Sequence, residues 1–185
     1  MPMFKWFKRL KVQKEAKKTI KELGNDFNAL WEADLDSIWT ITDKNQFLIA
    51  MDGWLCRKCD FGEAIEKLSE AERVFYLNAK LETEVNNGGF SQFFYNTNGD
   101  FTKEIENALC TIGAHHTASI YKKSLLALEG TLPKGQHVRE ALCDELLTDS
   151  LDKLFNECDD EFYKYVDDLQ ELNYQYIINN KEQFT

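Results

Sequence analysis

The stretch Glu84-Val85-Asn86-Asn87-Gly88-Gly89-Phe90-Ser91-Gln92-Phe93-Phe94-Tyr95-Asn96 joins the end of a predicted helix to a short aromatic segment. Apolar residues before it recur at the spacing of three and four that marks one helical face: Val74, Leu77, Leu81 and Val85. Ser69 and Glu72 form the Ser-x-x-Glu pattern of a capping box, so a helix is expected over residues 69–86. The two glycines can supply the left-handed residue that ends a helix. The aromatic residues that follow are expected to enter a core: Phe90, Phe93 and Phe94.

The whole chain has the composition of a compact all-α protein. Its 185 residues are 43% hydrophobic and 13% aromatic, which is enough to form a full core. Only two prolines and few long runs of β-branched residues are present, which favours helices over sheet. We therefore expect a compact, single-domain, multi-helix protein over residues 25–185, preceded by a basic helical extension over residues 1–24.

Capping residues and glycines place the other helices. They are expected over residues 4–23, 43–56, 100–112, 115–128, 138–147, 151–165 and 169–180. Asp100 is expected to cap one helix and Gly113 to end it, and the helices on either side of Gly113 should pack as an antiparallel hairpin. Asp167 begins an Asp-x-x-Gln capping box, which predicts a break before the last helix. Residues 25–44 fit either a helix or, at residues 39–42, a short strand.

Charge is distributed very unevenly along the chain. The formal net charge is -10, yet residues 1–24 hold eight Lys or Arg and two Glu, a net of +6. The remaining residues therefore sum to -16, and residues 140–171 alone hold twelve Asp or Glu against two Lys, a net of -10. The chain is thus a basic head followed by an acidic body, and like-charge repulsion argues against direct nucleic-acid binding by this body.

Neither an export signal nor a membrane span is expected. Lysines interrupt residues 1–23 too often for the apolar core of a secretory signal, and no run approaches the ~20 apolar residues of a membrane helix. Five cysteines in a chain without an export signal indicate reduced thiols. These observations predict a cytoplasmic protein.

The central stretch and three shorter segments resemble a bacterial family of domains of unknown function. The shorter segments are Ile112-Gly113-Ala114, Leu151-Asp152-Lys153-Leu154-Phe155 and Tyr174-Gln175-Tyr176-Ile177. The resemblance runs from about Asn45 to Phe184. The best-known member of that family is a DNA-mimic protein, an acidic helical protein that occupies the DNA-binding surface of a transcription factor. The resemblance therefore implies a DNA-binding protein as the partner, inhibited by DNA mimicry.

The acidic segment suits this role because its carboxylates fall at helical spacings. Glu145, Asp149 and Asp152 follow the spacing of four and three along one stripe. Two adjacent helices from residues 140–171 would carry about one net charge per ~2.4 Å of axis, against ~1.7 Å for duplex DNA. The residues expected to stand in for phosphates are Asp144, Glu145, Asp149, Asp152, Glu157, Asp160, Glu161 and Asp168.

Several alternatives stay open. The acidic segment also fits an ordinary solvated face, and its electrostatics fit an immunity-type inhibitor of a basic toxin or nuclease. A further alternative is a small-molecule or enzymatic site around residues 86–96. The basic head interleaves aromatic residues with cations over residues 3–10, which fits a membrane-surface contact, a nucleic-acid-binding arm, a clasp on the acidic body or a frayed extension.

Catalytic and metal-binding motifs are weak. Cys56 and Cys59 have the spacing of half a zinc site, but no second pair follows. His115 and His116 are adjacent, so on a helix they point about 100° apart and cannot share one ion. Glycine-rich phosphate loops and nucleophile motifs are missing from the sequence. We therefore expect no enzymatic activity, no cofactor and no metal.

The central stretch is also rich in amides, with Glu82 and Glu84 nearby. Amides at a helix end can satisfy backbone groups that cost about 1–3 kcal/mol each when they are left unpaired. A ligand-gripping pocket is the alternative. We expect a structural role for the residues that carry the family resemblance: Glu84, Asn86, Asn87, Gly88, Gly89, Phe90, Gln92, Phe93 and Asn96.

Overall fold

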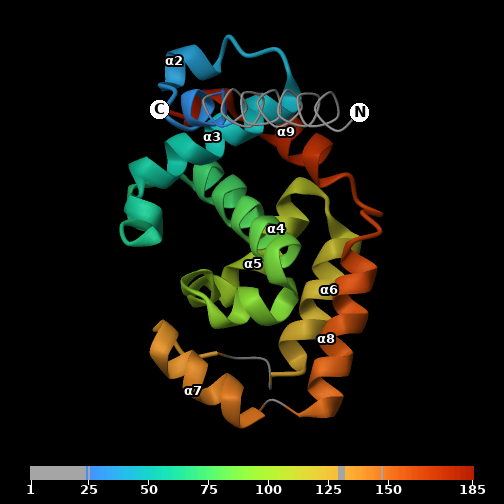
Figure 1. Ribbon diagram of the computed structural model, residues 1–185. Coiled ribbons are helices and arrows are strands. Elements are labelled where there is room, and N and C mark those ends of the chain that lie inside the picture. Colours follow the sequence, from blue (N-terminus) through green and yellow to red (C-terminus); the bar gives the residue numbers. More distant parts are fainter. Residues whose placement is uncertain (1–23, 25, 129–131, 147) are drawn as a thin grey trace, which may run out of the picture. The chain divides into compact units, whose positions relative to one another are not determined.

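The computed structural model describes residues 24, 26–128, 132–146 and 148–185, with the backbone alone for residues 97, 98 and 143–146 (Figure 1). Within these residues every regular element is helical, which confirms the all-α prediction. The α-helices are α2 Leu35–Ile38, α3 Lys44–Lys58, α4 Glu70–Tyr95, α5 Thr102–Ile112, α6 His115–Leu126, α7 Gln136–Leu146, α8 Asp149–Phe162 and α9 Leu169–Asn179. Short 3-10 helices lie between and after them: η1 Asp60–Gly62, η2 Ile65–Lys67, η3 Thr97–Phe101 and η4 Lys181–Gln183.

The chain divides into two compact units, residues 1–54 and 55–185, and α3 crosses the division. In the first unit residues 26–31 are helical, and the Asp34 carboxylate caps α2 by accepting a hydrogen bond from Ser37 N at 2.8 Å. The strand alternative for residues 39–42 is wrong, because Trp39 turns back to pack on Phe47 at 5.5 Å between ring centroids. The helix expected over residues 4–23 and the role of the basic extension lie outside the described residues.

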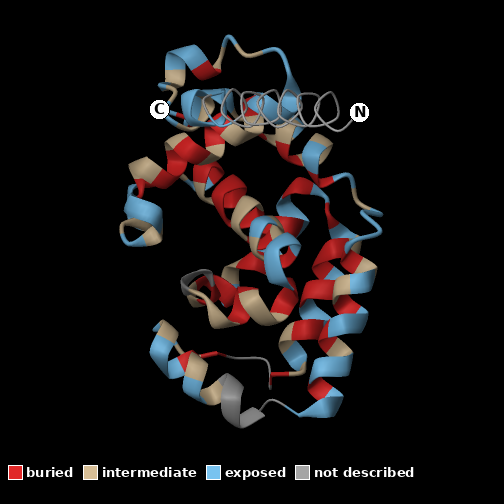
Figure 2. Cartoon of the chain, viewed as in Figure 1, coloured by how far each residue is buried: buried red, intermediate tan, exposed pale blue. Residues whose placement is uncertain are grey.

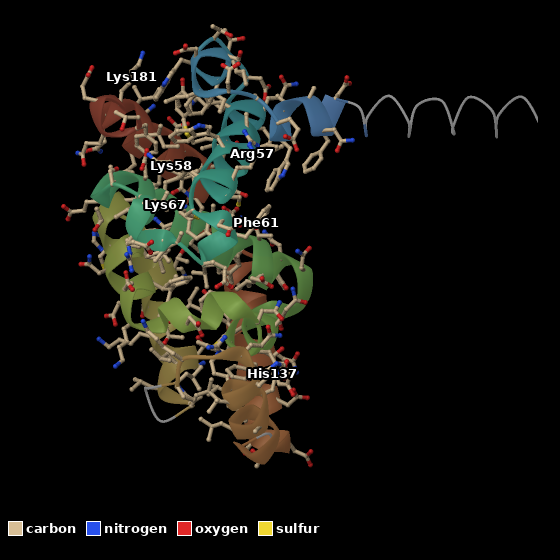
Figure 3. All side chains as sticks on the ribbon, turned by 90° about the vertical axis from the view of Figure 1, so that its left-hand side faces the viewer. Arg57, Lys58, Phe61, Lys67, His137 and Lys181 are labelled. Atoms are coloured by element: carbon tan, nitrogen blue, oxygen red, sulfur yellow. The ribbon has the colours of Figure 1, made fainter. Side chains whose placement is uncertain are left out.

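Helix α4 forms the centre of the second unit, where it packs against α5, α7, α8 and α9 (Figure 1). Its start confirms the predicted capping box: Ser69 Oγ accepts from Glu72 N at 3.2 Å, and the Glu72 carboxylate accepts from Ser69 N at 2.8 Å. Glu72 is fully buried and pairs at 2.7 Å with Nζ of Lys58, which is labelled in Figure 3. Buried residues follow α4 and the sides of α5 and α8 that face it (Figure 2), so the core surrounds this helix.

The first helical segment of α4 breaks at the glycine pair, close to the predicted end near residue 86, and after this kink a second helical segment follows that was not predicted. Gly88 and Gly89 leave the helical dihedral angles, Gly89 with φ +76°, and the helix resumes at Phe90. The Asp159 carboxylate of α8 accepts a hydrogen bond from Phe90 N at 2.8 Å and thereby caps the resumed helix. The aromatic residues of this turn are fully buried, as predicted: Phe90, Phe93 and Phe94.

The end of α4 is held by Arg139 of α7, a residue that no sequence pattern singled out. The Arg139 side chain is fully buried. Its Nε donates to Phe94 O at 3.0 Å, and a second guanidinium nitrogen donates to Pro133 O at 3.2 Å. The guanidinium also donates to Asn96 O and pairs with the Asp100 carboxylate. Arg139 therefore satisfies carbonyls that the helix end leaves without intrahelical partners.

The α5 and α6 helices form the predicted antiparallel hairpin. Helix α5 ends at Gly113, which has φ +87°, and this confirms the predicted end. The Tyr121 hydroxyl of α6 donates to Thr102 O at the start of α5 at 2.6 Å, so the chain has reversed direction. The prediction that Asp100 caps α5 is wrong, because Asp100 lies in η3 and its carboxylate pairs with Arg139 instead.

The predicted break before α9 is confirmed, but its capping residue is Asp168 and not Asp167. The Asp168 carboxylate accepts a hydrogen bond from Glu171 N at 3.0 Å. The Asp167 carboxylate accepts from Thr117 N at 2.7 Å, in the first turn of α6. Two neighbouring aspartates thus cap two different helices, and packing of α6 beside this segment decides which helix each one serves.

Candidate functional site

Helix α8 holds most of the expected partner-binding carboxylates whose side chains the structure describes. Its inner face is buried and consists of Leu151, Phe155, Cys158 and Phe162. The opposite face is exposed, as the helical period requires. It bears four of the expected residues, which we call the acidic row: Asp149, Asp152, Glu157 and Asp160.

The acidic row makes few contacts within the chain. Glu157 Oε2 lies 3.5 Å from Lys123 Nζ of α6, and both side chains are 53% exposed. The carboxylates of Asp149, Asp152 and Asp160 form no hydrogen bond or ion pair with the side chains that the structure describes. An exposed pair such as Glu157 with Lys123 is weak, so the row presents its charge to solvent.

Glu161 and Asp168 take part in bonds within the chain. Glu161 pairs with Lys164, and its Oε1 lies 3.2 Å from His116 Nε2. The hydrogen bond and charge of Lys164, with a smaller contribution from His116, lower the pKa of Glu161. Asp168 caps α9. These two carboxylates therefore offer less free charge than the acidic row.

Asp144 and Glu145 lie near the end of α7, and their side chains are outside the described set. Thr148 begins a new helix, since its Oγ1 accepts a hydrogen bond from Leu151 N at 3.2 Å. Glu145 and Asp149 thus belong to different helices. The spacing of four and three that predicted one stripe crosses a helix start, so Glu145 does not continue the acidic row along α8.

The charge of α8 approaches that of one DNA strand. Its 14 residues include six Asp or Glu and one Lys, a net of -5. At 1.5 Å rise per residue the helix is ~21 Å long, which gives one net charge per ~4 Å. One strand of a DNA duplex presents one phosphate per ~3.4 Å of axis. A single helix of this protein therefore has nearly the linear charge density of a strand.

Three side chains of the central stretch form a hydrogen-bonded cluster across the kink in α4. Glu84 Oε2 accepts from Gln92 Nε2 at 2.7 Å and from Asn96 Nδ2 at 2.8 Å. Gly88 lies beneath Gln92, because a Cβ at Gly88 would lie 2.2 Å from Gln92 Oε1. The cluster ties the two halves of α4 together. Asn87 is exposed and takes no part in it.

Asp159 lies next to the acidic row in sequence but points into the kink. A Cβ at Gly89 would lie 2.2 Å from Asp159 Oδ2, so only glycine leaves room for this carboxylate. Burial raises the pKa of Asp159, although the hydrogen bond from Phe90 N opposes the shift. Asp159 therefore serves the fold, while its neighbour Asp160 faces solvent.

Two tyrosines after α8 connect this part of the chain to the central stretch. The Tyr163 hydroxyl donates to Val85 O at 2.7 Å. The Tyr165 hydroxyl accepts from Asn86 Nδ2 at 2.6 Å and donates to Glu82 Oε1 at 3.1 Å. Asn86 and Tyr165 are 79 residues apart, so sequence spacing carried no signal for this contact.

Glu82→Gln is expected to change how stability depends on pH. Burial raises the pKa of Glu82 above the ordinary value for a glutamate, so the folded state binds the proton more tightly than the unfolded chain. The stabilising effect of this group is greatest in acid and declines as pH rises through the folded pKa. Urea unfolding between about pH 4 and about pH 8 should show the variant gaining stability relative to the parent as pH rises.

Glu161→Gln provides the opposite control. Its Lys164 partner lowers the pKa of Glu161, so this carboxylate stabilises the fold above the unfolded pKa and that effect is lost as pH falls. The Glu161→Gln variant should therefore lose stability relative to the parent as pH rises. A Glu82→Gln difference that stays constant with pH would contradict the effect of burial on Glu82.

A pocket of about 410 Å³ lies beside the central stretch. Its lining combines charged, polar and aromatic side chains: Cys56, Phe61, Glu63, Tyr76, Lys80, Thr83, Glu84 and Asn96. Phe61, labelled in Figure 3, is 60% exposed and has φ +54°. Since Glu84 and Asn96 belong to the central stretch, this pocket is where the small-molecule alternative would act.

The cysteines and histidines show no metal site in the described part of the chain, where no group of three or more His, Cys, Asp or Glu could hold an ion. Cys56 and Cys59 are buried, and burial raises the pKa of the Cys59 thiol, which disfavours the reactive thiolate. His116 contacts Glu161, a residue of the acidic segment. Among the described helices, none has the length and apolar character needed to cross a membrane.

The comparison with protein families matches this architecture. A family model described as DMP19-like protein covers residues 66–180, from η2 to the end of α9, which is more than half of the chain. DMP19 is a family of DNA-mimic proteins. Searches of curated proteins and of solved structures found no match. With its all-α fold, its acidic helices and this family match, the chain belongs to the DMP19-like protein family.

Proposed function

We propose that this chain binds a DNA-binding protein through the acidic row and inhibits it by occupying its DNA-binding surface. Membership of a DNA-mimic family supports this function. The observation that carries the proposal is the acidic row itself, whose carboxylates project from α8 opposite its buried face. Further phosphate stand-ins are proposed around it: Asp144, Glu145, Glu161 and Asp168.

The length of the acidic row suits the surface with which a DNA-binding partner contacts the phosphates of one strand. From Asp149 to Asp160 the chain advances eleven residues, or ~16 Å along the helix axis. One DNA strand places about six phosphates over that length, one per ~3.4 Å of axis, and the row places four carboxylates, one per ~5.5 Å. The row is thus sparser than a DNA strand, but its carboxylates lie close enough together for the Lys and Arg side chains of one DNA-binding surface to meet several of them at once. Attraction between such exposed charges speeds encounter and weakens as salt is added.

A basic toxin or nuclease fits the same surface, because such a protein also presents Lys and Arg to nucleic acid. The identity of the captured partner distinguishes an immunity-type inhibitor from an inhibitor of a transcription factor. The small-molecule alternative uses the pocket lined by Glu84 and Asn96 and does not involve the acidic row. Neutralising the row therefore tests the first two functions and leaves the third untouched.

Neutralising the acidic row with isosteric amides should weaken partner binding about 30-fold. The variant is Asp149→Asn, Asp152→Asn, Glu157→Gln and Asp160→Asn. Each exposed charge pair contributes roughly 0.5 kcal/mol, so four pairs give about 2 kcal/mol, which corresponds to about 30-fold in Kd. The partner is captured from lysate on the full chain, eluted with duplex DNA, purified, and titrated against the parent and the variant.

The matched control neutralises four exposed carboxylates elsewhere in the chain: Glu32→Gln, Asp36→Asn, Glu66→Gln and Glu182→Gln. It makes the same change in net charge, so any general effect of charge is held constant. An equal loss of affinity in both variants would rule out a specific role for the acidic row. A partner that duplex DNA does not displace would rule out mimicry.

A further inference from the structure

The segment between α8 and α9 exposes three large apolar side chains. Tyr163 is 46% exposed, Tyr165 38% and Val166 61%. We call these three residues the tyrosine patch. Single exposed apolar residues are ordinary, whereas neighbouring ones on an otherwise charged surface mark an interaction site. The patch adjoins the acidic row in the chain, since Tyr163 follows Asp160 by three residues.

The tyrosine patch is held rigidly against α4. The Tyr163 hydroxyl donates to Val85 O at 2.7 Å. The Tyr165 hydroxyl accepts from Asn86 Nδ2 at 2.6 Å and donates to Glu82 Oε1 at 3.1 Å. Both tyrosines therefore use their hydroxyls inward while part of each ring remains exposed to solvent.

Aromatic packing and backbone strain fix the rings further. The Phe162 ring centroid lies 6.2 Å from that of Tyr163, 5.5 Å from that of Tyr165, and 5.9 Å from that of the buried Phe90. Tyr165 has φ +47°, a left-handed conformation that residues other than glycine rarely adopt. Strained residues gather at binding sites, where surrounding contacts hold them in place. Rings positioned in advance lose little freedom on binding.

Carboxylate charge lies close to both rings. Burial is the largest cause of the raised pKa of Tyr163, and the charges of Asp159 and Asp160 add to it. Burial raises the pKa of Tyr165 to about 12, and the charge of Glu82 contributes. The patch therefore combines fixed aromatic faces with nearby negative charge, which is the setting that attracts a cation.

We propose that the tyrosine patch anchors an arginine side chain of the basic partner, with the guanidinium stacked on a tyrosine face and bonded to Asp160. Lys164, the cation within this segment, is bonded to Glu161. Arginine suits the site better than lysine, because its planar guanidinium stacks on a ring and bonds a carboxylate at the same time. This inference rests on the proposed function and names the partner group that meets the surface beside the acidic row.

The test compares octa-arginine and octa-lysine peptides, titrated by calorimetry into the full chain. Octa-arginine should bind the parent about five-fold more tightly than octa-lysine, since each stacked guanidinium adds a cation–π contribution. The variant Tyr163→Leu with Tyr165→Leu keeps apolar bulk and every charge. It should reduce the preference for arginine to about two-fold or less, while the affinity for octa-lysine stays unchanged.

Two further variants separate ring loss from loosening of the segment. Tyr163→Phe with Tyr165→Phe keeps the rings without their hydroxyls and should retain the preference. Leu126→Ala with Ile178→Ala removes exposed apolar side chains elsewhere and should change nothing. A preference for octa-arginine that persists in the leucine variant would overturn the proposal that the tyrosine patch anchors arginine. The proposed function would still stand if the acidic-row variant bound both peptides more weakly than the parent. If neither peptide binds the parent, the arginine anchor is wrong, whereas the proposed function is decided separately by the captured partner and the acidic-row variant.

Discussion

Replacing Arg139 with leucine is expected to lower the free energy of unfolding by about 3–5 kcal/mol, the range typical of removing one partner from a buried ion pair. The Arg139 side chain is fully buried, and its partner Asp100 is 28% exposed. Leucine would leave the Asp100 carboxylate and the carbonyls of Phe94 and Asn96 without this donor. Urea unfolding followed by circular dichroism measures the loss.

Arg73 is the matched control, because it makes a comparable two-point contact near the surface. Its Nε and Nη2 donate to the Glu104 carboxylate at 2.7 Å and 2.8 Å, and its side chain is 31% exposed. Exposed pairs contribute about 0–1 kcal/mol, so Arg73→Leu should lower stability by less than about 1 kcal/mol. Arg139→Lys keeps the charge without the fork of donors and should fall between the two. Equal losses for both leucine variants would contradict the role assigned to burial.

Gly89→Ala should lower the free energy of unfolding by about 3 kcal/mol, for two reasons that act together. Gly89 has φ +76° and ψ -176°, a combination essentially restricted to glycine. An alanine Cβ would also lie 2.2 Å from Asp159 Oδ2, which would displace the acceptor of the Phe90 N hydrogen bond. Urea unfolding of Gly89→Ala, Asp159→Ala and the double variant would measure how far the two sites are coupled.

Gly113→Ala isolates the backbone contribution. Gly113 also has a positive φ, +87°, but the nearest atom to an added Cβ is Leu172 Cδ2 at 4.0 Å, which is ordinary contact. Only the left-handed conformation is penalised there, so the loss should be about 1 kcal/mol. If Gly89→Ala costs no more than Gly113→Ala, the close approach of Asp159 has no energetic importance.

Features that depend on residues within one turn were predictable from the sequence. The Ser69 capping box and the glycine end at Gly113 are examples, because each is formed by side chains and dihedral angles a few residues apart. Burial of Phe90, Phe93 and Phe94 followed from composition in the same way. Interactions between residues close together in the sequence were therefore enough to predict the helical fold class and most helix boundaries.

The kink in α4 marks the limit of local prediction. The glycine pair interrupts the helix as predicted, but nothing local predicted the second helical segment after it, whose Phe90 N donates to Asp159, 69 residues further along the chain. Arg139 plays a similar part at the end of α4, 45 residues after Phe94. Such partners are invisible in sequence spacing, since only the packing of α7 and α8 brings them to α4.

The candidate site also contains some residues that the sequence suggested and others that only the structure shows. Charge, helical spacing and the family resemblance together suggested Asp149, Asp152, Glu157 and Asp160 as partner-binding residues, and the structure exposes all four on α8. The sequence analysis included Asp160 and left out Asp159, but no spacing indicated that Asp159 would accept a hydrogen bond from Phe90 N at the kink. The tyrosine patch was missed altogether, since its exposure follows from hydroxyl contacts with α4 and not from any motif.

The sequence by itself determined an all-α protein with an acidic surface, because helix periodicity, capping and net charge are summed over neighbouring residues. Tertiary structure alone decided that a second helical segment follows the glycines of α4 and that Asp159 turns inward to cap it. It also decided that two tyrosines stand fixed beside the acidic row. Each of these outcomes depends on a hydrogen bond between residues far apart in the chain, where a polar group takes whichever partner packing provides.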